Sequence, residues 1–328
     1  MSDLRLTLAC GPYDRMEALW NGKVKPKGIE LDYQTIMPPE VFDRMIDKQE
    51  FEIAEMGSSR HIARCMSGRW PFVGLPVFPS KMFRHGYIFI NRKSGIAKPT
   101  DLAGKRIGVP LYGMTAAIWI RGQLAEHYGV DLSQVKWFRG GLYTAESPDD
   151  NSTRGANVPV KIEFIGRDRT LDAMLAAGEL DAVIGAEKAP SFGKHPDVAR
   201  LFANPRAEER DYWRKTQIHP IMHMVVIRED VYRKNPWIAA SMFDAFERAK
   251  KWAMDMMRMN HAQRVMLPWL YDDLDEIDEL FGGDPWSYGV EPNRKTLETL
   301  IRNMTDQGLL LNKVTVDQLF APVEGLKS

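Results

Sequence analysis

Gly113 and Thr115, at the start of an expected helix, form the first candidate site for chemistry in this chain. The segment KRIGVP is rich in strand formers, YGMTA supplies a turn, and AAIWIRGQLAEHYG has the apolar spacing of a helix that ends at Gly129. Unpaired backbone N–H groups and the positive end of the helix dipole at such a start bind carboxylates or phosphates. The pattern predicts an anion-binding turn, although any βα unit of an α/β protein has the same general form.

Two histidines four residues apart, His219 and His223 in HPIMH, raise the question of a metal site. On a helix this spacing would place both rings on one face, but Pro220 and the following Val-Val-Ile run favour an extended chain. Residues four apart in an extended chain are separated by about 13 Å, so one metal ion cannot bind both. The sequence has no HExxH or CxxC motif, and we expect no metal site.

The charge balance narrows the class of partner. Lys plus Arg and Asp plus Glu number 44 each among 328 residues, so there is no basic footprint for nucleic acid or for an acidic membrane surface. No run reaches the roughly 18 apolar residues that span a bilayer. A small molecule is the expected partner, in a chain long enough for two lobes, and a homo-oligomer is left open.

The cysteines and the first residues predict the compartment. Cys10 and Cys65 have no framework spacing, which favours a reducing environment. In the opening MSDLRLTLACGPYDR, the run LRLTLAC alternates like a strand, and the opening lacks the basic, apolar and small-residue regions of a signal peptide. We therefore expect a cytoplasmic protein.

Strand-like and helical segments alternate along the chain, which predicts an α/β fold. The expected strands are Leu4–Ala9, Ile29–Ile36, Glu52–Met56, Tyr87–Asn91, Arg106–Val109, Val160–Ile165, Ala182–Gly185 and His223–Arg228. The expected helices are Pro39–Lys48, Ser59–Ser67, Ala116–His127, Thr170–Ala177, Pro236–Met259 and Arg294–Gln307. The polar, turn-rich stretch 140–159 predicts an insertion loop or lid.

The order of these segments resembles the type 2 periplasmic-binding-protein fold. The resemblance covers nearly the whole chain and rests on the G-x-Y-D-R turn after the first strand, K-P-x-G-I-E-L, E-F-E-I-A-E-M-G-S-S, K-P-T-D-L-A-G-K-R-I-G-V-P, A-G-E-L-D-A-V-I-G and H-x-V-V-I-R-E-D. It implies two α/β lobes, with residues 1–92 and 204–328 in the first and 93–203 in the second. It also implies that a ligand binds in a cleft between the lobes.

Within that fold the sequence resembles the 4,5-dihydroxyphthalate decarboxylase family, through LACGPYDR, PPEVFDRM, EFEIAEMGSSRHI, GLPVFPSKMFRHGYIFIN and HPIMHMVVIRED. The resemblance implies a carboxy-lyase that converts a dihydroxylated aromatic dicarboxylate, 4,5-dihydroxyphthalate, into 3,4-dihydroxybenzoate and carbon dioxide. Each carboxylate of this substrate stands para to a hydroxyl, which can push electron density onto the carbon that is to be protonated. No cofactor is expected, because the hydroxyl supplies the electrons.

This chemistry needs a cationic group that binds the retained carboxylate, and four positions are candidates. Arg60 follows a strand that ends in EMGSS, and the carboxyl ends of strands face the ligand in open α/β sheets. Arginine binds a carboxylate with two parallel hydrogen bonds whereas lysine is a point charge, so Arg60 and Arg84 are favoured over Lys81. The backbone from Gly113 to Thr115 is the fourth candidate.

The same chemistry needs a general acid and a partner for the phenol. Three histidines are candidates for the acid or for substrate binding: His85, His219 and His223. His85 and His223 are expected to begin strands that lie near the crossings between the implied lobes, so both are predicted as catalytic residues. Glu187, after a strand of the second lobe, is predicted to accept the phenol proton. The other histidines fit surface positions, or helix packing in the case of His61.

Two alternatives remain open at this stage. One is a non-catalytic solute receptor of the same fold, and the other is an enzyme on this fold of the menaquinone futalosine or thiamine-pyrimidine type. The expected absence of a signal peptide argues against an exported receptor. No segment beyond the shared fold resembles the other two enzyme types.

Overall fold

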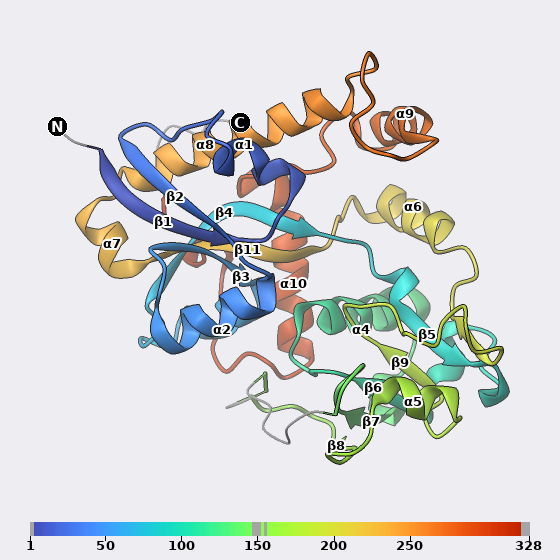
Figure 1. Cartoon of the computed structure of the whole chain (residues 1–328). Coiled ribbons are helices and arrows are strands. Elements are labelled where there is room, and N and C mark those ends of the chain that lie inside the picture. Colours follow the sequence, from blue (N-terminus) through green and yellow to red (C-terminus); the bar gives the residue numbers. More distant parts are fainter. Residues whose placement is uncertain (1–2, 146–151, 154–155, 323–328) are drawn as a thin grey trace. The chain divides into compact units, whose positions relative to one another are not determined.

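The computed structural model describes residues 3–145, 152–153 and 156–322 (Figure 1). Within them the chain divides into two compact units, each with its own sheet. Unit 1 comprises residues 3–81, 221–297 and 314–322, and unit 2 comprises 82–220 and 298–313, apart from the undescribed positions. The expected boundaries at 92/93 and 203/204 therefore differ from the observed ones.

The sheet of unit 1 has the strand order β2-β1-β3-β11-β4. Its strands are β1 (Leu4–Cys10), β2 (Ile29–Thr35), β3 (Ile53–Gly57), β4 (Phe72–Lys81) and β11 (Ile221–Arg228). β1 runs parallel to β2 and β3, whereas β11 runs antiparallel to β3 and β4. The carboxyl ends of β1, β3 and β4 therefore lie at the same sheet edge as the first residues of β11.

Helices cover both faces of this sheet, with α2 on one face and α1 and α8 on the other (Figure 1). Unit 1 contains α1 (Glu17–Trp20), α2 (Pro38–Lys48), α3 (Ser58–Arg64), α7 (Glu229–Lys234), α8 (Ile238–Met257) and α9 (Leu270–Phe281). Beneath α2 the apolar face of the sheet is closed by a cluster that includes Phe42, Met45, Phe51 and Met56. This packing holds β3 in the interior, where each of its residues is buried.

The sheet of unit 2 has the order β10-β5-β9-β6-β7-β8. Its strands are β5 (Ile88–Asn91), β6 (Arg106–Val109), β7 (Lys136–Arg139), β8 (Ile162–Phe164), β9 (Ala182–Ile184) and β10 (Val198–Arg200). The helices of this unit are α4 (Thr115–Tyr128), α5 (Leu171–Ala176) and α6 (Pro205–Thr216), while α10 (Arg294–Asp306) begins in unit 1 and ends in unit 2. β5 belongs to this unit rather than the first because it pairs with β9 and β10.

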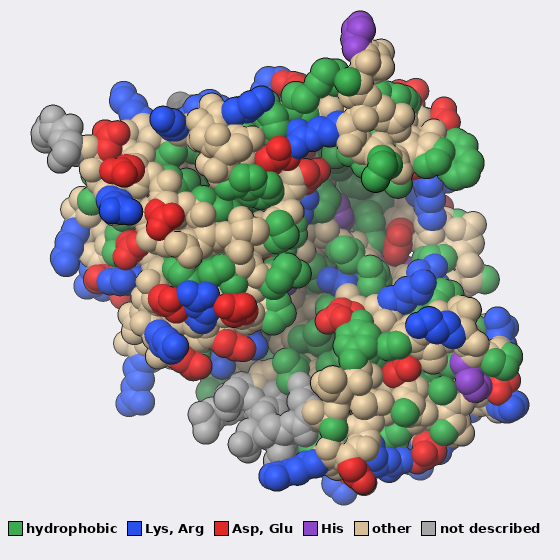
Figure 2. Space-filling model, viewed as in Figure 1, with side chains coloured by type: hydrophobic (Ala, Val, Ile, Leu, Met, Phe, Trp, Pro, Cys, Tyr) green, Lys and Arg blue, Asp and Glu red, His purple; other side chains and the backbone are tan. Residues whose placement is uncertain are grey.

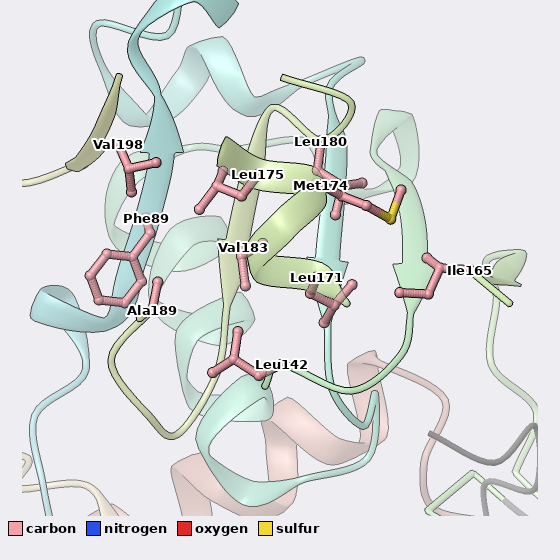
Figure 3. Packing of buried hydrophobic residues seen from close by; sticks show 10 residues of the cluster. All are labelled: Phe89, Leu142, Ile165, Leu171, Met174, Leu175, Leu180, Val183, Ala189 and Val198. Carbon is pink, nitrogen blue, oxygen red and sulfur yellow. The ribbon is translucent and has the colours of Figure 1, made fainter. Parts of the chain in front are cut away.

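α5 packs on the second sheet through an apolar cluster that contains Leu171, Leu175, Leu180 and Val183 (Figure 3). The helix begins where the Thr170 hydroxyl accepts a hydrogen bond from the Ala173 amide. A Cβ at Gly108 in β6 would lie 2.8 Å from Leu171 Cδ2, so a residue without a side chain is needed for this close approach.

The described surface carries charges of both signs. On the face shown in Figure 2, Lys and Arg side chains are interspersed with Asp and Glu. Among the described helices, none is long and apolar enough to cross a membrane. The expected lid at 140–159 lies partly outside the described residues.

Candidate active site

Glu55 is the most constrained charged residue at the carboxyl edge of the first sheet. It lies in the middle of β3 and is 0% exposed. Its Oε1 accepts hydrogen bonds from Tyr13 Oη at 2.7 Å and His223 Nδ1 at 2.6 Å. Its Oε2 accepts from the Gly11 amide at 3.0 Å and from Cys10 Sγ at 3.4 Å. Four donors thus converge on one carboxylate.

This arrangement favours the ionised carboxylate. Burial by itself raises the pKa of Glu55, but hydrogen bonds from His223, Gly11 and Tyr13 and the charge of His223 outweigh burial, so the pKa lies below its usual range. Burial and the negative charge of Glu55 in turn raise the pKa of Tyr13, which keeps that hydroxyl a donor.

The ionised Glu55 fixes the tautomer of His223. Because Oε1 can only accept, Nδ1 of His223 must carry the proton, and Nε2 is then the nitrogen that can exchange a proton with another molecule. Nε2 makes no hydrogen bond to any residue in the described part of the chain, and the His223 side chain is 22% exposed. The pair is built like an acid–base catalyst, with one nitrogen held and the other reachable.

The surroundings of His223 come from three elements. His223 lies in β11, which agrees with the extended chain predicted for HPIMH, and its cross-strand partners are Gly57 and Ser80. The ring of Phe42 from α2 packs edge-on against the imidazole, with centroids 5.0 Å apart. These contacts set the plane of the imidazole ring while leaving one edge open.

Arg60, predicted to bind a carboxylate, lies beside this cluster in α3. Its guanidinium is 5.6 Å from the centre of the Phe42 ring, the same ring that touches His223. Nη1 of Arg60 forms an ion pair with Asp43 at 3.1 Å, and the Asp43 side chain is largely exposed. An exposed ion pair of this kind is weak, so a ligand carboxylate can compete for the arginine.

Lys81 lies in unit 1 as well, at the end of β4, but its ammonium group is buried. Nζ donates to Asn293 Oδ1 at 2.6 Å and to Ser287 Oγ at 3.3 Å. Burial lowers the pKa of Lys81 to about 7. Both contacts belong to the segment before α10, which makes Lys81 a bridge between β4 and that segment.

The other six predicted residues belong to unit 2. Arg84 is buried and donates from Nη1 to the Ala186 carbonyl at 2.9 Å, and burial lowers its pKa to about 10. Glu187, the next residue, is exposed and hydrogen-bonds to Tyr143. The structure thus brings Arg84 to the backbone beside Glu187.

His85 and His219 occupy aromatic surroundings in unit 2. His85 was expected to begin a strand, but it lies in a 3-10 turn before β5, because the backbone becomes extended only at Ile88. Neither ring nitrogen of His85 has a hydrogen-bond partner among the described residues, and burial lowers its pKa to about 4. His219 stacks on Phe83 with centroids 4.7 Å apart. Because burial disfavours the imidazolium of His85, its ring is a poorer general acid near neutral pH than an exposed histidine.

The predicted anion-binding turn is partly filled by the protein itself. The Gly113 amide donates to Ser152 Oγ at 3.1 Å, and a Cβ at Gly113 would lie 2.2 Å from the Ser152 carbonyl oxygen. Thr115 is the first residue of α4 and is buried. A ligand that used the Gly113 amide would have to displace the Ser152 hydroxyl.

The sequence reasoning missed Glu55 and Tyr13. A signal for Glu55 was present, because a charged residue in the middle of the apolar strand IAEMG is costly to bury unless it is paired. Tyr13 gave no comparable signal, since its role depends on how the turn after β1 folds back over β3.

Two cavities of unit 1 are lined by residues other than Glu55 and His223. One of about 980 Å³ is lined by residues of α8 and by the segments on either side of α10, and one of about 180 Å³ by η1 (Asp14–Met16), α8, α9 and Trp286. Neither is lined by Glu55 or His223, so we locate the chemistry by the buried acid–base pair rather than by cavity size. Among the described residues, no group of three or more His, Cys, Asp or Glu side chains could hold a metal ion.

The fold resembles that of known binding proteins. Among solved structures, the periplasmic aliphatic sulphonate binding protein SsuA from Escherichia coli matches 98% of both chains with a TM-score of 0.56 and 12% identity. At this identity the likeness shows the fold alone, which is the two-lobed α/β fold of periplasmic binding proteins.

Curated sequences extend the relation beyond the fold. No protein-family model matches the chain. A 4,5-dihydroxyphthalate decarboxylase from Pseudomonas putida is 37% identical over 215 residues, which cover 65% of this chain and 83% of that protein. A 4,5-dihydroxyphthalate decarboxylase from Comamonas testosteroni is 34% identical over 325 residues, 98% of each chain. This chain therefore belongs to the 4,5-dihydroxyphthalate decarboxylase family.

Proposed function

We propose that this chain is a carboxy-lyase that converts 4,5-dihydroxyphthalate into 3,4-dihydroxybenzoate and carbon dioxide, with His223 as the general acid. The observation that carries the proposal is the 2.6 Å contact between His223 Nδ1 and the buried, ionised Glu55. The choice of a small aromatic dicarboxylate as substrate is supported by the names of the two relatives.

The proposed reaction needs one proton and no electrons from outside. Loss of a proton from one phenol gives a phenolate, whose electrons move onto the para carbon that bears a carboxylate. That carbon takes a proton from Nε2 of the His223 imidazolium and becomes tetrahedral. The bond to the carboxylate then breaks, carbon dioxide leaves, and the bonding electrons restore the aromatic ring. The phenolate regains a proton, and His223 takes up one from solvent.

Glu55 acts through His223 in this scheme and is a positioning residue. Its charge stabilises the imidazolium, and its Oε1 holds the proton on Nδ1 so that the reactive proton sits on Nε2. A carboxylate that orients a histidine in this way is a common arrangement in acid–base catalysis.

Further roles at the site are proposed or predicted for other residues. Arg60 is a candidate to bind a substrate carboxylate because it shares Phe42 with His223. Arg84, Gly113, Thr115 and the remaining predicted groups of unit 2 stay predictions. So do the cytoplasmic location and the absence of a cofactor, and a homo-oligomer stays open.

Turnover in heavy water tests the proposal. The purified protein is incubated with 4,5-dihydroxyphthalate in D₂O, and the product is examined by NMR. We expect 3,4-dihydroxybenzoate with one deuterium at C6, the position that lost its carboxylate, released together with carbon dioxide. His223→Gln should lower the rate of carbon dioxide release by about 10²- to 10⁴-fold, the usual contribution of general acid catalysis.

His261→Gln is the matched control, since His261 is an exposed histidine of the same unit. Binding of the dicarboxylate without any product after prolonged incubation would contradict the proposal and favour a receptor. A tenfold or smaller loss in the His223→Gln variant would remove His223 from the acid role.

A further inference from the structure

Arg15 is held in a fixed position immediately after β1, in η1. Its Nε and Nη2 both donate to the Pro79 carbonyl, at 2.7 and 2.5 Å. Its guanidinium contacts two aromatic rings, 4.4 Å from the centre of Tyr13 and 4.1 Å from that of Trp286. The plane and the direction of this cation are therefore set before any ligand arrives.

The guanidinium still has donors to offer. An arginine carries five N–H groups, and among the described residues three of them are used: two on Pro79 and one from Nη1 to Asp14 Oδ1 at 3.0 Å. The side chain is 15% exposed, and it lines the cavity of about 180 Å³. Two N–H groups remain, and the half-exposed Asp14 is a weak competitor for a third.

Two of the residues that contact Arg15, Tyr13 and Pro79, connect it to the proposed acid–base pair. Tyr13, which stacks on the guanidinium, donates its hydroxyl to the same Glu55 oxygen that His223 contacts. Pro79, which accepts two hydrogen bonds from Arg15, precedes Ser80, a cross-strand partner of His223. Arg15 thus lies in the same unit and at the same sheet edge as the pair.

We propose that Arg15 binds the carboxylate that the aromatic acid retains through the reaction. The identity of the acid rests on the proposed function, but the contacts that hold Arg15, and its binding of a carboxylate, do not require turnover. A fixed guanidinium loses little conformational freedom on binding, and its paired N–H groups match a carboxylate. Arg60 has one ring contact and one ion pair with an exposed aspartate, so its position is less constrained.

A ligand series tests this assignment by calorimetry. The product 3,4-dihydroxybenzoate has only the retained carboxylate, and catechol has the same two hydroxyls and no carboxylate. Arg15→Gln should lower the affinity for 3,4-dihydroxybenzoate about 10- to 100-fold and leave the affinity for catechol unchanged. Arg15→Lys should recover only part of the loss, because a lysine cannot form the two parallel bonds. Asp14→Asn removes the competing charge and keeps the arginine, so it should raise the affinity for 3,4-dihydroxybenzoate two- to fivefold.

Arg44→Gln is the matched control. Arg44 also stacks on an aromatic ring and pairs with carboxylates in unit 1, but its ring is that of Phe51, which lies before the amino end of β3. Its affinities should equal those of the wild type. In turnover, Arg15→Gln should raise KM at least tenfold with kcat reduced less than threefold, since the carboxylate is bound in ground state and transition state alike.

The two proposals fail separately. Suppose that the wild type releases no carbon dioxide but Arg15→Gln still lowers the affinity for 3,4-dihydroxybenzoate. That outcome would contradict the decarboxylase proposal and support the carboxylate site. Equal affinities of wild type and Arg15→Gln for 3,4-dihydroxybenzoate would reject the site. So would an equal weakening of catechol, which would show that the change only disturbs packing against Tyr13 and Trp286.

Discussion

Glu55→Gln is the change that tests the acid–base pair most directly, because it keeps the shape of the side chain and removes its charge. Four donors converge on the two carboxylate oxygens of Glu55. A glutamine offers one acceptor oxygen and one donor amide. In either orientation the amide faces two donors, those of Tyr13 and His223 or those of Gly11 and Cys10. The first of these orientations also removes the acceptor of His223 Nδ1.

The expected size of the effect follows from these contacts. A hydrogen bond to a charged group contributes about 1.5–3 kcal/mol, and each 1.36 kcal/mol is about tenfold in rate. Loss of the bond between His223 Nδ1 and Glu55 in the transition state should therefore lower kcat by about 10- to 150-fold. A buried donor left without an acceptor costs about 1–3 kcal/mol of folding stability. The protein should therefore remain folded, with a lower midpoint in urea.

A kinetic double-variant cycle separates positioning from mere destabilisation. The loss in kcat should not add to that of His223→Gln in the double variant, since Glu55 acts through His223. A folded Glu55→Gln variant with kcat within threefold of wild type, or losses that add in the double variant, would refute the reasoning.

Three further predictions concern other groups. If Arg60 binds a substrate carboxylate, Arg60→Ala should raise KM about tenfold or more in steady-state assays with little change in kcat, and a fall confined to kcat would speak against this role. Because burial lowers the pKa of Lys81 to about 7, the unfolded chain binds a proton between about pH 7 and 10 that the folded chain has released. The stability of the wild type relative to Lys81→Met should then rise with pH across that window in urea titrations, and a constant difference would contradict the assignment. Activity should survive exhaustive chelation and dialysis, whereas loss that one divalent ion restores would point to a metal site.

Elements with a strong local pattern could be predicted from the sequence. β1 has a partly alternating burial pattern, and α5 has a Thr170 cap and an end before Gly178, whose φ is +75°. α4 is buried on all sides over its first ten residues, so its clearest local signal is its end at Gly129, whose φ is +66°. β4 was missed because it contains Pro76 and Pro79, which argue against a central strand. The structure places β4 at the edge of its sheet, where a proline need not donate to a neighbouring strand.

Other features could not be predicted because they depend on contacts between distant segments. α6 is polar over most of its surface, and only Tyr212 and Thr216 are buried, so its periodicity is weak. The boundary before β5 depends on pairing with β9 and β10, which no local pattern reveals. Among the site residues, His223 was predicted from its place at the start of a strand, whereas its link to Glu55 spans 168 residues.

The environment of Glu55 explains why sequence propensity and function disagree at this position. Glutamate is disfavoured in strands, and a buried charge is costly unless every lone pair is satisfied. An apolar residue in the middle of β3 would avoid the cost of the buried charge, but it would leave the donors of Gly11, Tyr13 and His223 without this acceptor. Glu55 instead receives donors from the turn after β1 and from the start of β11, so its charge is supported by two segments that meet only in the folded unit. A polar residue that is locally unfavourable and fully satisfied by distant partners is typical of a site selected for chemistry rather than for stability.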